Sequence, residues 1–347
     1  MTRTPSPGSH HDVPAAKRWR LGEAPWRGDD RDAVPPSMRL IIDNDFSGDP
    51  DDLFQLVHHL LSPSVEIRAI VASHLRPGDG MDPSDHTATN AELVARDVFA
   101  RMGLESTGII HRGSEVALED DSTPRDTPAA RAIIAEAMRE DTDLPLVVAA
   151  GGGLTDVASA YLLEPAIASR MSLIWIGGPE HDGLAVPPPN AMPIEYNLLI
   201  DVVAAQVLFD APDLEIWQIP RDVYRQCLVS ETELRFRVAK AGPLGRYLYD
   251  EVRAIMGVIR ELGMPAFETY ALGDSPLVLL TALRSLFEPD SSSSVYVEKA
   301  TPQITDEGAY RPVRGTRPMR VYTHVDVRLM FEDFYLKLQE FEDWRGR

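Results

Sequence analysis

The sequence predicts a domain of the α/β class, in which an open and mainly parallel sheet is flanked by helices. From Met38 onward, short apolar runs alternate with amphipathic segments. The runs have the length of buried strands, and the amphipathic segments have helical spacing. Alternation of this kind builds a parallel sheet with helices on its faces. Because no repeat or linker interrupts residues 38–347, we expect one domain, although 347 residues would allow two.

The predicted strands are short apolar runs without a polar alternation, which is typical of strands buried on both faces. The first of them, residues 38–43, leads directly into a loop rich in aspartate. We place the strands of this first part of the chain at residues 38–43, 65–73, 106–111, 144–150, 172–178 and 214–220.

The predicted helices lie between these runs. In residues 52–62 the apolar side chains recur every three or four positions, which makes one apolar face. Gly103 suits the end of a helix, and Pro128 suits the first turn of another. We place helices at residues 52–62, 89–103, 127–140, 155–163 and 201–209.

The pattern changes after residue 220. Residues 230–263 and 275–287 have helical periodicity, and residues 294–324 read as a β segment interrupted by turns. Residues 325–342 are expected to form a closing helix.

The first 37 residues differ from the rest of the chain. They hold six of its 28 prolines and show no periodic apolar pattern. A segment of this composition buries too little apolar surface to repay the entropy of ordering it. We therefore expect residues 1–37 to be a disordered, proline-rich tail, followed by a single domain over residues 38–347.

Composition narrows the range of partners. The chain has 54 acidic and 34 basic side chains, a formal net charge of −20, and no cluster of Lys and Arg of the kind that binds nucleic acid. No apolar run approaches the roughly 18 residues of a membrane span. A single cysteine, Cys227, excludes an internal disulfide and fits a reducing compartment. We expect a cytoplasmic protein without nucleic-acid or membrane partners.

The most informative stretch is the loop over residues 43–52, in which five of ten residues are aspartate. Helix capping explains Asp49, and the helix dipole favours Asp51, but neither explains all five. Carboxylates this close repel one another unless a cation lies among them, and hard oxygen ligands suit calcium or magnesium. The carboxyl end of a strand is also where open α/β sheets bind ligands.

An EF-hand calcium loop would use alternate positions of this stretch, with Gly48 at the sixth position. Its twelfth position should be a glutamate, and here it is Phe54. The loop also follows a strand and not a helix, so we set this interpretation aside.

The Asp-x-Asp start after a strand is also similar to phosphatases of the haloacid dehalogenase type. Asp43 would then be the nucleophile and Asp45 the acid. That pattern expects Thr or Val at the place of Ser47, and it leaves Asp51 and Asp52 unexplained. The phosphatase remains an alternative.

Four blocks in order resemble the inosine-uridine preferring nucleoside hydrolases. The first is the loop itself, which matches the longer DxDxxxDxDD form of the family's opening signature. The second is the stretch 144–179, with its Gly-Leu-Thr turn and its Gly-Gly after a strand. The remaining two are Asn190…Glu195-Tyr196-Asn197…Asp201 and Gly273-Asp274-Ser275-Pro276-Leu277.

The resemblance implies a Rossmann-like nucleoside hydrolase fold and a calcium-dependent hydrolysis of ribonucleosides to ribose and free base, as in purine salvage. By similarity, calcium is held by three carboxylates and one carbonyl: Asp45, Asp52, Asp274 and Gly151. Asp45 is expected to be the general base for the attacking water. The sugar is expected to contact Asp51, Asn190, Glu195 and Asn197. The family also implies a homodimer or homotetramer.

The chain departs from the family at one catalytic position. Well-known members have a histidine before the late aspartate that protonates the leaving base, and here that residue is Gly273. Tyr270 or His181 are candidate replacements, and departure of the base without a protein acid is the other possibility. His74 is more simply explained as a structural histidine. A nucleoside- or sugar-binding relative with weak turnover is therefore an alternative function.

Overall fold

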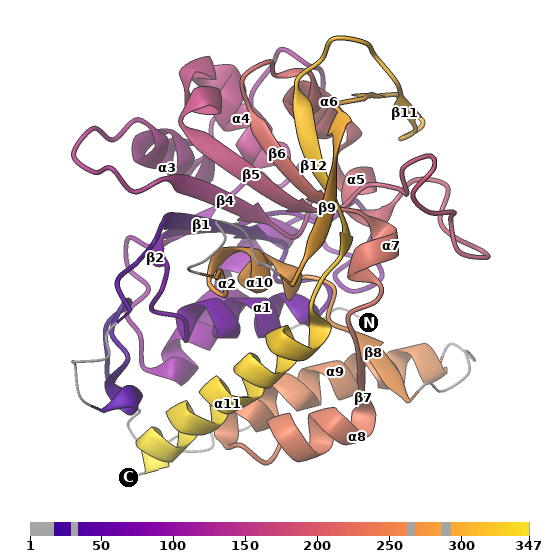
Figure 1. Ribbon diagram of the computed structural model, residues 1–347. Coiled ribbons are helices and arrows are strands. Elements are labelled where there is room, and N and C mark those ends of the chain that lie inside the picture. The colour runs from indigo at the N-terminus through magenta and orange to yellow at the C-terminus, as the bar shows by residue number, and fades with distance from the viewer. Residues whose placement is uncertain (1–16, 29–33, 262–267, 286–292, 347) are drawn as a thin grey trace.

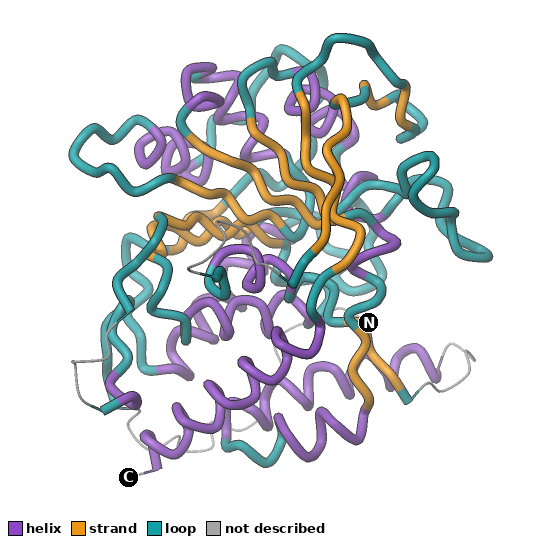
Figure 2. Tube along the Cα trace, in the orientation of Figure 1, coloured by secondary structure: helices purple, strands orange, loops and turns teal. Residues whose placement is uncertain are grey.

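The computed structural model describes residues 17–28, 34–261, 268–285 and 293–346. At its centre is an eight-stranded sheet with the strand order β3-β2-β1-β4-β5-β6-β12-β9. Within this sheet every neighbouring pair is parallel except β12 and β9. Figures 1 and 2 show helices packed against both faces of the sheet, as the alternating sequence pattern predicts. The predicted fold class is confirmed.

The strands of the large sheet are β1 (Arg39–Asn44), β2 (Glu66–Ala72), β3 (Ile110–Arg112), β4 (Leu146–Ala150), β5 (Met171–Ile176), β6 (Glu215–Ile219), β9 (Val295–Ala300) and β12 (Pro318–His324). Two small antiparallel pairs are β7 (Leu228–Ser230) with β8 (Thr269–Ala271), and β10 (Gln303–Ile304) with β11 (Tyr310–Arg311).

The helices are α1 (Asp51–Leu60), α2 (Thr87–Met102), α3 (Pro128–Ala137), α4 (Thr155–Leu163), α5 (Tyr196–Ile200), α6 (Val202–Asp210), α7 (Arg221–Tyr224), α8 (Glu231–Glu233), α9 (Pro243–Glu261), α10 (Pro276–Thr281) and α11 (Val327–Gly346). Short turns of other helical types are η1 (Pro25–Arg27), η3 (Pro165–Ser169) and the π-helical η4 (Leu234–Val238).

Each face of the sheet has its own apolar core. Successive side chains of a strand point to opposite faces, so Ile41 of β1 joins one core while Leu40 and Ile42 join the other. The Ile41 side is covered by α3, α4 and α6, and the opposite side by α1, α2, α9, α10 and α11. Burying one such side chain contributes about 1.5–3 kcal/mol, so these two layers hold the sheet in place.

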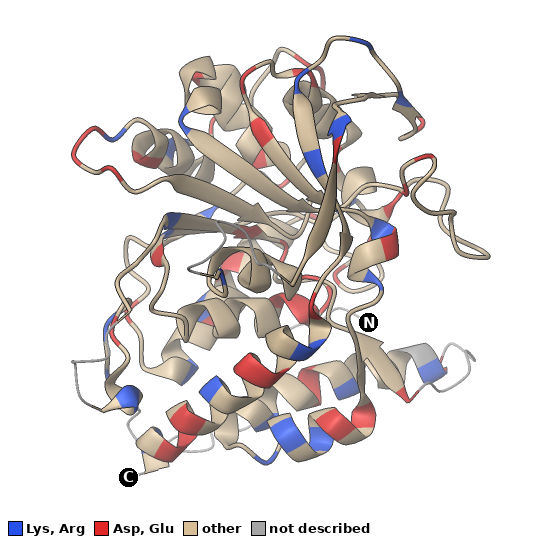
Figure 3. Ribbon diagram, in the orientation of Figure 1, with Lys and Arg blue, Asp and Glu red and all other residues tan. Residues whose placement is uncertain are grey.

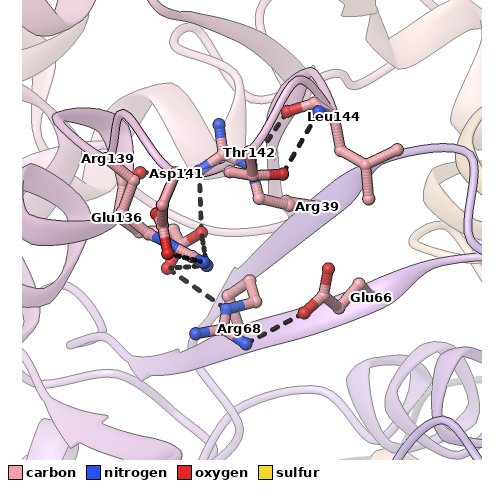
Figure 4. A network of polar contacts seen from close by, with 8 residues as sticks. All are labelled: Arg39, Glu66, Arg68, Glu136, Arg139, Asp141, Thr142 and Leu144. Atoms are coloured by element: carbon pink, nitrogen blue, oxygen red, sulfur yellow. Dashed lines mark hydrogen bonds and ion pairs between the residues drawn. The ribbon is translucent and has the colours of Figure 1, made fainter.

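The amino end of β1 is fixed by a network of charged groups (Figure 4). The buried guanidinium of Arg39 donates from Nη1 to Oε1 of Glu136 at 2.7 Å and from Nε to the Leu144 carbonyl at 2.9 Å. Arg68 on β2 donates to the other oxygen of Glu136 at 3.2 Å. These bonds hold the end of α3 to β1 and β2 at the edge opposite the aspartate loop.

The predicted helix over residues 230–263 is interrupted in the structure. It begins with α8 and η4, stops, and starts again as α9 at Pro243. Proline lacks a backbone N–H and disfavours helical geometry in the residue before it, which explains the break. Residues 262–263 and 286–287, at the ends of two predicted helices, lie outside the described residues. Sequence periodicity also failed to indicate α5, α7, β7 and β8, which are all five residues or shorter.

Residues 17–28 are ordered, contrary to the expected disorder of the whole tail. Trp19 and Trp26 are buried and lie edge to face with a centroid distance of 4.8 Å. Trp26 also packs edge to face on Phe341 of α11 at 5.2 Å. The indole N–H of Trp19 donates to the Met102 carbonyl at 2.6 Å. Two large aromatic side chains thus supply the apolar burial that the proline-rich composition does not suggest.

Charged side chains of both signs are interspersed on the continuous stretch of α8 and η4, on α9 and on α11 (Figure 3). One pair, Arg237 and Glu332, joins η4 to α11 at 2.7 Å. Among the helices that the structure describes, none combines the length and the apolar character needed to cross a bilayer.

Candidate functional site

The aspartate loop lies at the point where the strand order of the sheet reverses. The chain runs outward from β1 through β2 to β3 and then returns to β4 on the other side of β1. Asp43, near the end of β1, is in register with Ala150 at the end of β4. The loops after these two strands separate here, and this crevice is where open α/β sheets bind their ligands.

Three carboxylates from distant parts of the chain meet at this crevice. Asp51 and Asp52 open α1, and Asp274 precedes α10. One oxygen from each lies within 4.8 Å of one oxygen from the others. The backbone N–H of Asp274 donates to Oδ2 of Asp51 at 3.2 Å. The structure thus places Asp52 and Asp274 together with Asp51, while Asp45, a predicted metal ligand, is not one of these three.

Asn44 fixes the orientation of Asp274. Its amide Nδ2 donates to Asp274 Oδ2 at 2.6 Å. Asn44 is the variable middle residue of the Asp-x-Asp motif, which is why motif reasoning passed over it. Its position at the carboxyl end of β1, where open α/β sheets bind ligands, is the sequence signal that could have identified it.

The electrostatics of the cluster favour a cation. Burial, followed by the Asp274 carboxylate, raises the pKa of Asp45 and of Asp51 well above the usual range. Burial and the neighbouring carboxylates do the same for Asp52, and burial raises the pKa of Asp274 to about 6. Oδ2 of Asp52 is buried and has no hydrogen-bond partner among the described residues. A divalent ion with oxygen ligands would relieve both the repulsion and the unpaired oxygen.

The glycine turn after β4 is pressed against this cluster. A Cβ added to Gly151 would lie 2.2 Å from Asp274 Oδ2, and one added to Gly152 would lie 3.0 Å from Asp45 Cγ. Only a residue without a side chain lets the backbone pass this close. The Gly151 carbonyl, a predicted metal ligand, accepts a hydrogen bond from Asn197 Nδ2 at 2.6 Å.

Two of the residues predicted to bind sugar brace the loop between β5 and α5. Glu195 caps α5, and its Oε2 also accepts from the Gly178 N–H at 2.7 Å. Its Oε1 accepts from the Tyr224 hydroxyl at 2.7 Å. Asn197 donates from Nδ2 to the carbonyls of Gly151 and of Ile176, the latter at 2.8 Å. Both residues are therefore held at the carboxyl ends of β4 and β5.

Asn190, the third predicted sugar ligand, lies elsewhere in the same loop. It is exposed, and its φ of 61° is the left-handed conformation that asparagine adopts more readily than most residues. Among the described residues its side chain does not join the hydrogen bonds around Glu195.

The histidines considered at the sequence level have structural environments. His181 is buried, donates from Nε2 to Gln218 Oε1 at 2.8 Å, and stacks on Tyr310. Burial lowers the pKa of His181. His74 is buried and contacts Thr155 Oγ1 through Nε2 at 2.9 Å. Neither side chain is placed by its contacts at the carboxylate cluster.

The position of Asp43 disfavours the phosphatase alternative. Asp43 is fully buried, and burial followed by the Asp156 carboxylate raises its pKa well above the usual range. A phosphatase nucleophile has to reach a phosphoryl group as an anion. Burial keeps the Asp43 carboxylate away from a phosphoryl group, and its raised pKa favours the protonated form.

Comparison with known proteins agrees with this geometry. The family model of the "inosine-uridine preferring nucleoside hydrolase" matches residues 40–332. The chain is 27% identical over 191 residues to an inosine-uridine preferring nucleoside hydrolase of Crithidia fasciculata, covering 53% of this chain and 56% of the relative. The corresponding protein of Leishmania major is 26% identical over 190 residues, with 53% and 55% coverage. The chain thus spans about half the length of the curated relatives it matches.

Solved structures share the fold. A plant nucleoside hydrolase superposes with a TM-score of 0.66 at 18% identity, covering 88% of this chain and 99% of that one. A purine-preferring ribonucleoside hydrolase from Gardnerella vaginalis gives 0.65 at 20% identity, with the same coverage. The family match, extending from β1 into α11, includes the whole carboxylate cluster. This chain belongs to the family of inosine-uridine preferring nucleoside hydrolases.

Proposed function

We propose that this protein hydrolyses the N-glycosidic bond of ribonucleosides, releasing ribose and the free base, with calcium as its metal. The observation that carries the proposal is the convergence of Asp51 and Asp52 with Asp274 at the crevice of the sheet. A family match over the same residues supports it.

The residues proposed to hold calcium are Asp45, Asp52 and Asp274, with the Gly151 carbonyl beside them. The raised pKa values of the three carboxylates and the unpaired oxygen of Asp52 fit a divalent ion. When bound, calcium supplies a positive charge that acidifies and orients water.

The chain's own residues then perform the reaction. Asp45 accepts a proton from the attacking water. The remaining carboxylates stabilise the positive charge that develops on the sugar as the bond to the base breaks. Asp51 accepts hydrogen bonds from ribose hydroxyls, while Asn190, Glu195 and Asn197 hold the rest of the sugar.

A second candidate is a nucleoside-binding protein with weak turnover. Gly273 favours it, since a glycine cannot supply the proton that the leaving base needs. The two candidates differ in turnover but not in binding.

A ribose-release assay separates these functions. The protein is incubated with inosine, uridine, adenosine or guanosine in calcium, and reducing sugar is measured with and without EDTA. Ribose release that EDTA abolishes and calcium restores supports the hydrolase. Tight nucleoside binding without ribose supports the second candidate. Asp274→Ala should abolish release, and Asp343→Asn, on the exposed end of α11, is the matched control.

A further inference from the structure

We propose that the hydroxyl of Tyr270, positioned by Asp49, donates the proton to the leaving base. This inference rests on the proposed function. It names a proton donor for a chain in which Gly273 stands at the place of the family's histidine. Tyr270 lies on β8, three residues before Gly273 and four before Asp274.

Asp49 ties Tyr270 to the carboxylate cluster. The Tyr270 hydroxyl donates to Oδ1 of Asp49 at 2.6 Å. The same oxygen accepts the backbone N–H of Asp51 at 3.3 Å. One carboxylate oxygen of Asp49 thus links the Tyr270 hydroxyl to the first turn of α1. That turn contains Asp51, which is proposed to bind the ribose.

Position 273, where family members have the histidine, lies next to Asp51. A Cβ added to Gly273 would lie 3.2 Å from Oδ2 of Asp51. A side chain at position 273 would therefore project beside Asp51, whose amide is anchored to Asp49. The added Cβ would also lie 3.4 Å from Cδ2 of Tyr224. Asp51 therefore links the place of the missing histidine to the Tyr270–Asp49 pair, and Tyr224 borders that place from another side.

The backbone around Tyr270 is fixed. Tyr270 pairs with Val229 in the β7–β8 ladder. The N–H of Leu272 donates to the Cys227 carbonyl at 2.8 Å. The segment that carries Asp274 into the cluster is thereby the same segment that holds Tyr270, so the two side chains are positioned together.

Other phenols and histidines near the site have different partners. The Tyr224 hydroxyl donates to Glu195, and the Tyr196 hydroxyl donates to Asp79 at 2.7 Å. Burial raises the pKa of both phenols further above the ordinary value, which weakens them as acids. His181 is stacked within the protein between Gln218 and Tyr310.

The proton and electron balance is as follows. The bond between C1′ and the base nitrogen breaks, and its electron pair goes to the base. The Tyr270 hydroxyl proton moves to a ring nitrogen of the departing base. Water oxygen bonds to C1′, and the water proton goes to Asp45. Asp45 then releases a proton to solvent and Tyr270 takes one up, so the net reaction consumes one water.

A pair of substrates tests this role. Inosine needs a proton on its leaving base, whereas p-nitrophenyl β-D-ribofuranoside releases a stable phenolate and needs none. We expect Tyr270→Phe to lower kcat on inosine by roughly 10²- to 10⁴-fold, the usual contribution of a general acid. The same variant should retain wild-type kcat on the nitrophenyl riboside, which also shows that it is folded.

Asp49→Asn tests the positioning role and should produce the same split between the two substrates with a smaller loss. Tyr296→Phe, on the edge strand β9, is the matched control and should change neither rate. Unchanged hydrolysis of inosine by Tyr270→Phe, or an equal loss on both substrates, would overturn the assignment. If the wild-type protein cleaves only the nitrophenyl riboside, it has no working acid and the assignment is also wrong. If it cleaves neither substrate, the proposed function itself fails.

Discussion

One methyl group added at Gly151 should disturb the carboxylate cluster directly. In Gly151→Ala the new Cβ would lie 2.2 Å from Asp274 Oδ2 and 2.5 Å from Asn44 Nδ2, whereas ordinary contact begins at 3.4 Å. The two groups are hydrogen-bonded to each other at 2.6 Å, so neither can withdraw alone. Asp274 must therefore move by roughly 1 Å, and a displacement of that size costs about 10²-fold in rate. Overpacking should also cost about 1–3 kcal/mol of stability.

Gly257 provides the control for this substitution. It lies within α9, and a Cβ added there meets nothing within 4 Å. Gly257→Ala should leave the rate unchanged and stabilise the helix by about 0.5–1 kcal/mol. The measurements are ribose release at saturating calcium and urea unfolding of both variants. Wild-type turnover in Gly151→Ala would refute the claim that Asp274 must hold its position against this turn.

Three further predictions concern the base, the cluster and the N-terminal segment. Asp45→Asn should lower kcat on inosine by at least about 10²-fold, because it removes the proposed base, while the thermal midpoint in EDTA should not fall; a turnover near that of wild type would exclude Asp45 from this role. Because burial raises the pKa of Asp274 from 3.8 to about 6, this group favours the fold at low pH and loses that contribution as the pH rises through 6. In EDTA the wild type should therefore lose about 2 kcal/mol relative to Asp274→Asn between pH 4 and pH 7 in urea unfolding, and a constant difference would contradict the shift. Trp26→Ala should destabilise the protein by about 3–5 kcal/mol in the same assay, since its side chain is buried against Phe341; Leu336→Ala, which is exposed on α11, is the control, and equal effects would show that residues 17–28 add nothing.

Sequence reasoning succeeded where the signal was a strong local pattern. The apolar runs of β1, β4 and β5 are buried over nearly all of their length, so their composition alone identifies them. The approach of Asp274 to Asp52 was predicted from the order of the family's motifs. No local property of residues 43–52 specifies a partner more than 200 positions away.

Sequence reasoning failed for segments whose structure depends on contacts with residues far away in the sequence. Trp19 and Trp26 lie in a proline-rich stretch, and contacts with distant elements bury them. Phe341 and Trp344 of α11 pack on Trp26, and the Met102 carbonyl of α2 accepts a hydrogen bond from Trp19. The β7–β8 pair consists of two three-residue strands separated by α8, η4 and α9, so neither strand has a readable period. Asn44 was missed because its role depends on the position of Asp274.

The distance along the chain between Asn44 and Asp274, 230 residues, has a consequence for biosynthesis. A ribosome must complete most of the polypeptide before the last carboxylate becomes available, so nascent chains carry an incomplete ligand set. Affinity for the ion should consequently appear late in maturation and together with native structure, because metal binding of this kind is coupled to folding. On the proposed function, truncated or partly folded products would neither sequester calcium nor consume nucleosides.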